Sequence, residues 1–197
     1  MGADTRSDLA FRLRKRGVPL GELFCFLSGL YFRGKLAYAR AFAAPPPPAS
    51  GSFIITPNAG LVSPDTLVKL DRLQLIASGN IDPSDERYRA PLDRDSRFLS
   101  EMIGEECDVV LLGSIATPKY VEPLLAIFGG RLLFPREFVG RGDMSRGGLM
   151  LRCVAAAQQL AYMPVLNASR QGPKPPKLAR LPATAKPAYL KNGLKLD

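Results

Sequence analysis

The sequence has no histidine and no tryptophan among its 197 residues. The lack of histidine excludes the Ser–His and Cys–His pairs with which many hydrolases activate a nucleophile. It also removes one of the two usual zinc ligands, so we expect no metal, and we expect no cofactor. Any proton transfer would then have to use the side chains of Asp, Glu, Lys, Tyr or Cys.

Cysteine and long apolar runs are also scarce. The three cysteines, Cys25, Cys107 and Cys153, form no CxxC pair and have apolar neighbours in the sequence. This pattern predicts small buried side chains in a reducing compartment. The longest strongly apolar run without charge, residues 23–32, has about half the length of a membrane span. The first residues lack the apolar segment of a signal peptide. We therefore expect a cytoplasmic protein with no membrane partner.

Acidic residues are rare at the two ends of the chain, although the net charge is +9. Residues 1–44 carry eight Lys/Arg and three acids, and residues 166–197 carry seven and one. The segment between them is slightly acidic, with twelve basic and fourteen acidic residues. A basic end is usually a solvated tail, and its functional alternative is electrostatic binding of phosphate backbones or an anionic surface.

Four consecutive prolines mark the clearest boundary in the chain. They predict an extended linker over residues 45–52, after an N-terminal helical segment of residues 1–44. Residues 51–165 are expected to form an α/β core domain. Residues 166–197 form a basic tail rich in Pro and Lys, which we expect to be disordered alone or to lie as an extended arm on a partner.

The hydrophobic pattern of the core predicts alternating strands and helices. Strands are expected at residues 52–56, 73–77, 107–115 and 131–135, and helices near residues 63–70, 94–103, 117–130 and 144–163. The 107–115 run is apolar on both faces, as a central strand of a parallel sheet must be. The predicted fold class is α/β, with a small, mostly parallel sheet flanked by helices in a Rossmann-like three-layer arrangement.

Three loops would meet at one edge of such a sheet if its strands are parallel. They are residues 56–65, 113–119 and 135–148, and each follows a predicted strand. In open parallel sheets, ligands bind at this edge, where the N-termini of helices present unpaired N–H groups.

The third loop has the composition of an anion site. Arg141 and Arg146 offer forked donors for phosphate, and Gly147 and Gly148 would let a ligand approach the helix closely. Asp143 would cap the helix or supply a carboxylate. In the alternative interpretation the arginines are solvated and the glycines serve helix–sheet packing. The predicted site comprises catalytic Asp143 and Ser114, with Gly113, Thr117, Lys119, Arg141, Arg146, Gly147 and Asn58 binding a phosphate or other ligand.

Two further stretches are ambiguous. Asp82 and Asp85 lie in an acidic segment with interspersed arginines, which usually indicates a solvated face and alternatively a general base or magnesium ligand. Residues 28–40 mix aromatic and cationic side chains as nucleic-acid surfaces do. At helical spacing, however, such aromatics are more often part of the core.

Along the chain, the first predicted strand and its loop are followed by the "LLGS" loop and then by the "FP" loop with its helix. This order resembles that of α/β enzymes acting on nucleobases, such as uracil-DNA glycosylases. The resemblance implies a nucleoside- or nucleobase-processing hydrolase or glycosylase-like enzyme. The chain lacks the His-Pro-Ser stretch of those enzymes, so no functional residue is transferred from them. We therefore predict a nucleotide- or nucleic-acid-directed protein with a phosphate site. The alternative is a non-catalytic adaptor that binds nucleic acid or a protein through its basic ends.

Overall fold

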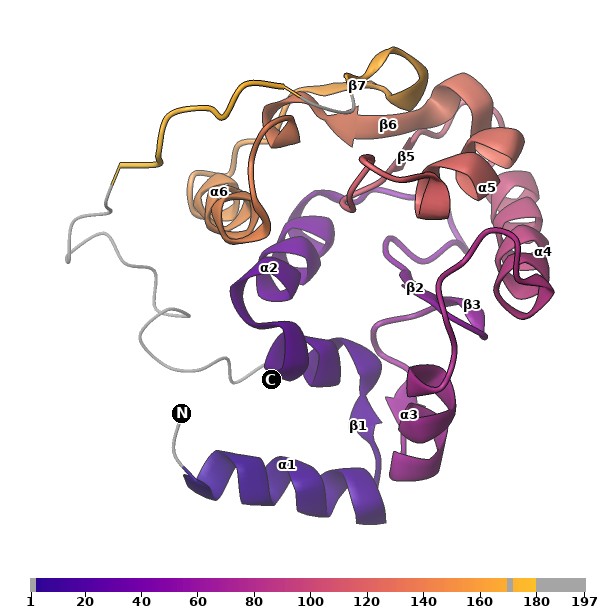
Figure 1. The fold of residues 1–197 in the computed structure, drawn as a ribbon, viewed down its shortest axis with the longest axis vertical. Helices are drawn as coiled ribbons and strands as arrows, with labels where there is room; N and C mark the ends of the chain where they lie inside the picture. Colours follow the sequence, from indigo (N-terminus) through magenta and orange to yellow (C-terminus); the bar gives the residue numbers. More distant parts are fainter. Residues whose placement is uncertain (1–2, 170–171, 180–197) are drawn as a thin grey trace.

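The computed structural model describes residues 3–169 and 172–179 (Figure 1). Within these residues the chain forms several α-helices: α1 (Ala3–Lys15), α2 (Leu20–Phe42), α3 (Leu70–Ala77), α4 (Glu86–Ile103), α5 (Pro118–Phe128) and α6 (Asp143–Ala155). Short 3-10 helices follow α5, β6 and β7: η1 (Gly129–Arg131), η2 (Arg136–Phe138) and η3 (Val165–Asn167).

The strands are short and form three separate small sheets. Strands β1 (Val18–Pro19) and β4 (Leu67–Val68) pair antiparallel, and β2 (Ile54–Thr56) and β3 (Gly60–Val62) form an antiparallel hairpin. The third sheet has the order β5–β6–β7, with bounds β5 (Val109–Val110), β6 (Leu132–Pro135) and β7 (Tyr162–Pro164).

The predicted Rossmann-like parallel sheet is therefore wrong. Within the described residues β5 and β6 form the one parallel pair, joined through α5, while β7 runs antiparallel to β6. The strand predicted as central is an edge strand of two residues. Beyond it, Leu111 and Ile115 are buried as loop residues, 7% and 3% exposed. An apolar run that packs on a core as a loop has the same sequence signature as a buried strand.

A second predicted strand, residues 73–77, is helical. It lies in α3, where Leu70, Leu73 and Ile76 pack on the same hydrophobic cluster and Leu75 is exposed. Spacing by three places these side chains on one face of a helix. The predicted helix near residues 63–70 instead contains β4 and the start of α3. Apolar runs this short fit both the helical and the strand periodicity, so the element that they pack against decides whether a helix or a strand forms.

Helix α2 connects two hydrophobic clusters. Leu20 and Leu23, near its start, belong to a cluster with Val18, Val68 and Ile76, whereas Tyr38 belongs to the larger cluster with β6 and α4 to α6. The helix is interrupted at Gly29, whose φ is 62°. A left-handed backbone at this position is one that glycine adopts without a Cβ penalty.

Helices α2 and α6 lie side by side (Figure 1), and their crossing is very close. A Cβ built on Gly34 would lie 2.7 Å from the carbonyl oxygen of Gly147. A Cβ built on Gly147 would lie 2.7 Å from the carbonyl oxygen of Leu30. Neither position has room for a side chain. The glycines thus bring the N-terminal part of α6 against the middle of α2.

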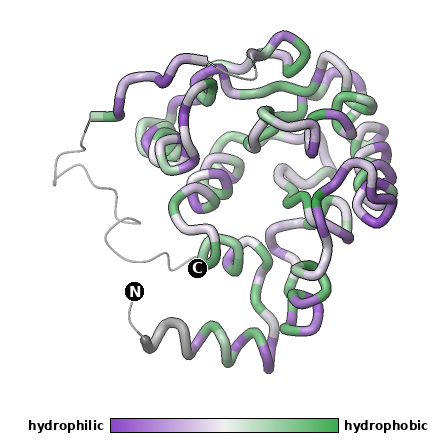
Figure 2. Tube along the Cα trace, viewed as in Figure 1, coloured by the Kyte–Doolittle hydropathy of each residue, from purple (hydrophilic) through white to green (hydrophobic). Residues whose placement is uncertain are grey.

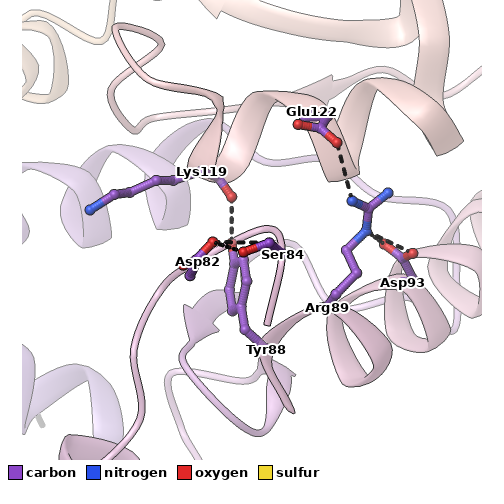
Figure 3. Close-up of polar contacts among 7 residues, drawn as sticks. All are labelled: Asp82, Ser84, Tyr88, Arg89, Asp93, Lys119 and Glu122. Carbon is purple, nitrogen blue, oxygen red and sulfur yellow. Dashed lines mark hydrogen bonds and ion pairs between the residues drawn. The ribbon is translucent and has the colours of Figure 1, made fainter. Parts of the chain in front are cut away.

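Helices α4 and α5 pack together through apolar and polar contacts. Hydrophilic and hydrophobic residues alternate along α4 (Figure 2), and its buried residues are Tyr88, Leu92, Ser96, Leu99 and Ile103. Arg89 bridges Asp93 and Glu122 across the two helices (Figure 3). The Tyr88 hydroxyl donates to the carbonyl of Lys119 at 2.8 Å. Because Pro123 lacks the N–H that would bond this carbonyl in a regular helix, Tyr88 satisfies an otherwise free acceptor.

The first part of the predicted tail lies against the body of the protein. The Pro173 carbonyl closely approaches Gly140, and Arg141 donates to the carbonyl of Pro176 at 3.4 Å. Arg152 donates to the carbonyl of Ala179. Residues 172–179 therefore run as an extended arm beside α6. The remainder of the predicted disordered tail, residues 180–197, lies outside the described residues.

Candidate functional site

A large cavity lies between α2, the β2–β3 hairpin, α3, α4 and the segment that contains β5. Its volume is about 990 Å³, within the range of sites that bind small molecules. Most of its lining is apolar and comes from both hydrophobic clusters. Aromatic side chains contribute much of it: Phe24, Phe32, Phe42, Tyr120 and Phe128. A ligand that fits this space must have a substantial apolar body.

Several polar side chains gather in one part of the cavity wall. Lys35 and Tyr31 come from adjacent turns of α2, and the Lys35 ammonium lies 4.1 Å from the centroid of the Tyr31 ring. The Tyr31 hydroxyl donates to the carbonyl of Leu112, just after β5, at 3.2 Å. Ser114 and Asp143 line the same cavity from the loop after β5 and from the first residue of α6.

Lys35 has the most unusual electrostatic environment of these groups. Burial lowers its pKa to about 8, because removing the ammonium from water penalises its charged form. The carboxylate of Asp143 opposes this lowering, and the positive charge of Arg146 adds to it. Within the described part of the chain Lys35 has no carboxylate partner at ion-pair distance. It is a cation held over an aromatic ring in an apolar cavity.

The structure brings together three of the residues predicted for the site. Gly113, Ser114 and Asp143 all line the cavity, because their loops follow the parallel neighbours β5 and β6. The Ser114 hydroxyl accepts from the backbone N–H of Ala116 at 3.3 Å, which stabilises the turn. Asp143 remains largely exposed, with 67% of its side chain accessible.

The two arginines predicted to bind phosphate contact the protein backbone instead. Arg146 is only 12% exposed, donates twice to the carbonyl of Phe138 and stacks over the Phe138 ring. Arg141 donates to the carbonyl of Glu137 and to the hydroxyl of Ser145. Both side chains fix the loop before α6, and neither lines the cavity. Neither arginine is fully solvated, and a phosphate role for them remains a prediction.

The other predicted residues lie away from the polar cluster. Gly147 is buried in the α2–α6 crossing, so its packing partner is a helix and not a sheet. Thr117 precedes α5, makes no side-chain capping bond and is exposed, and Lys119 is exposed beside it (Figure 3). Asn58 lies in the β2–β3 turn and donates to the carbonyl of Leu75 at 2.5 Å. That turn belongs to a different sheet from β5 and β6, so the three predicted loops do not share one sheet edge.

The acidic segment before α4 has a structural role in the described contacts. Asp82 accepts from the backbone N–H and the hydroxyl of Ser84, as Figure 3 shows for the hydroxyl. Asp85 caps α4 by accepting from the N–H of Arg87 and also pairs with the Arg87 side chain. These bonds lower the pKa of both carboxyl groups. They involve Oδ1 of Asp82 and both carboxylate oxygens of Asp85.

Sequence reasoning missed Lys35 and Tyr31 as site residues. Both lie in the 28–40 stretch, whose aromatics were expected to belong to the core. The available signal was a Tyr and a Lys spaced four residues apart, which places them on one helical face. That spacing alone does not tell a solvated face from a cavity wall.

Comparisons with protein-family models, with curated proteins and with solved structures gave no match for this chain. Over the described residues, no helix has the length and apolar character needed to cross a membrane.

Proposed function

We propose that the protein binds a small amphipathic organic anion, with the apolar body of the ligand in the cavity and its anionic group at Lys35. The observation that supports this is Lys35, which lies in the wall of a large, mainly apolar cavity and has no carboxylate at ion-pair distance among the described residues. With Lys35 and Arg146 positive and Asp143 negative, the local charge is +1. This charge suits a ligand with one negative charge.

The nucleotide- or nucleic-acid-directed function remains a prediction. Its phosphate would have to be held by Lys35, since Arg141 and Arg146 already donate to backbone carbonyls. The adaptor alternative predicts loops packed shut, whereas Gly113 and Ser114 border a cavity. The cavity therefore supports a small-molecule site over an adaptor surface.

Two fluorescent probes of the same ring system test the proposal: 1-anilinonaphthalene-8-sulfonate, which carries one negative charge, and the neutral N-phenyl-1-naphthylamine. Lys35→Met should weaken binding of the sulfonate about tenfold or more, since a hydrogen bond to a charged group contributes about 1.5–3 kcal/mol. Binding of the neutral probe should be unchanged. Lys69→Met, which removes an exposed lysine, serves as the matched control.

The pH dependence gives an independent measurement. Affinity for the sulfonate should fall as pH rises through about 8, because Lys35 loses its charge there. The neutral probe should show no such fall. Equal affinities of Lys35→Met and wild type for the sulfonate, with both proteins folded by far-UV circular dichroism, would refute the proposal.

A further inference from the structure

We infer that Lys35 is also a nucleophile, which forms an imine with the carbonyl group of an apolar aldehyde or ketone bound in the cavity. The inference deepens the proposed function, because it needs the same cavity and the same side chain. Lys35 lines the cavity, and its amine lies 4.1 Å from the centroid of the Tyr31 ring. It is also the one lysine among those whose exposure the structure describes that is not exposed.

Three features favour this reaction at Lys35. The apolar cavity can hold the hydrocarbon part of a substrate beside the amine, which converts an encounter in solution into a local reaction. Within the described residues no carboxylate lies at ion-pair distance, so no ion pair holds the amine in its charged form. Burial lowers the pKa of Lys35 to about 8, so a sizeable fraction is the neutral amine at neutral pH.

The reaction balances without an oxidant or a reductant. The lone pair of the neutral amine attacks the carbonyl carbon, and the C=O π electrons move to the oxygen. The nitrogen loses a proton and the oxygen gains one, which gives a carbinolamine. Asp143 lines the same cavity and can carry this proton. The hydroxyl then gains a second proton, the C–O bond breaks and water leaves as the nitrogen lone pair forms the C=N double bond. The nitrogen finally loses its remaining proton, which replaces the one that the hydroxyl took up, and the neutral imine results.

The experiment incubates the full chain with octanal and sodium cyanoborohydride at about pH 7.5 and locates the octylated lysines by peptide mass spectrometry. A lysine of pKa 8 is about one-quarter neutral at this pH, and one of ordinary pKa about 0.1%. The neutral fractions thus differ about 200-fold. Because a weaker base is a weaker nucleophile, we expect Lys35 to be labelled at least tenfold faster than exposed Lys69 and Lys119.

Two controls connect the labelling with the cavity. The naphthalene sulfonate should protect Lys35 and leave the labelling of Lys69 unchanged. Lys35→Arg should lose the fast-labelled peptide, whereas Lys69→Arg, at an exposed lysine, should keep it.

Labelling of Lys35 no faster than Lys69 in the folded protein would overturn the inference. If sulfonate binding still depends on Lys35 in that case, the proposed function stands and only the imine chemistry fails. If neither probe binds, both proposals fail together.

Discussion

Replacing Gly147 by alanine tests the close crossing of α2 and α6. A Cβ at this position would lie 2.7 Å from the Leu30 carbonyl oxygen and 2.8 Å from the Tyr31 Cα, whereas ordinary contacts begin at 3.4 Å. The two helices would have to separate by roughly 0.7 Å, which a close-packed interior resists. Both obstacles are backbone atoms, so no change of rotamer relieves the overlap.

The expected magnitude follows from two opposing effects. Alanine stabilises a helix interior by about 1 kcal/mol relative to glycine. Overpacking costs about 1–3 kcal/mol, and the backbone obstacles favour the upper end. We therefore expect Gly147→Ala to lower the free energy of unfolding by about 2 kcal/mol. Gly148→Ala is the matched control, since among the described residues its Cβ would meet only the Leu178 side chain, at 3.6 Å. That variant should be more stable than wild type by about 1 kcal/mol.

The two variants should thus differ by about 3 kcal/mol, or about 6–12 °C in Tm for a chain of this length. Thermal and urea unfolding followed by far-UV circular dichroism measure this difference, since the chain has no tryptophan to report on unfolding. Equal stability of the two alanine variants would refute the close crossing. It would also favour the earlier prediction that Gly147 lacks a side chain so that a ligand can approach the helix.

Three further changes test other parts of the structure. Tyr88→Phe should lower the free energy of unfolding in urea by about 1–3 kcal/mol, because the Lys119 carbonyl loses its donor at 2.8 Å. Pro123→Ala restores the helical N–H to this carbonyl, so an equal loss from Tyr88→Phe in that background would contradict this reason. Arg131→Met should lower the free energy of unfolding by about 2 kcal/mol, because the guanidinium donates to the carbonyls of Gly104 and Cys107 and to the hydroxyl of Ser100. The control, Arg136→Met at an exposed arginine, should change it by less than about 0.5 kcal/mol. The pKa of Lys35 is lower in the folded than in the unfolded chain, so at this residue the unfolded protein binds more protons between about pH 8 and 10.5, and the contribution of Lys35 to stability should rise with pH there. Because burial raises the pKa of the Cys25 thiol, which has the opposite effect, the quantity to measure is the difference in stability between wild type and Lys35→Met; it should shift in favour of wild type by about 2 kcal/mol between pH 7.5 and 9.5.

Local features of the fold were predictable where the sequence carries strong signals. The β6 strand, the α5 helix that joins two parallel strands, and a long helix ahead of the prolines all follow from their patterns. The size and order of the sheets did not follow. They depend on which apolar segments pair, and in residues 107–115 only Val109 and Val110 form a strand, while Leu111 and Ile115 are buried outside it. A single sequence does not encode that choice locally.

The candidate site was predictable to a smaller extent. The loops after β5 and β6 were expected to meet, and Ser114 and Asp143 do line one cavity. The arginines of the loop before α6 predicted a phosphate site, but Arg146 donates to the Phe138 carbonyl and lies over the Phe138 ring. Which acceptor a guanidinium binds depends on which carbonyls the fold leaves without a donor, and the local sequence does not show this. Lys35 was missed because its surroundings come from segments far away in the chain.

The interruption of α2 at Gly29 has a consequence for how the molecule melts. The two hydrophobic clusters share this one helix, and the cavity wall draws on both of them. A ligand that fills the cavity would contact both hydrophobic clusters at once and couple their unfolding, although α2 is interrupted at Gly29 between them. Saturating the cavity should therefore sharpen the melting transition as well as raise its midpoint.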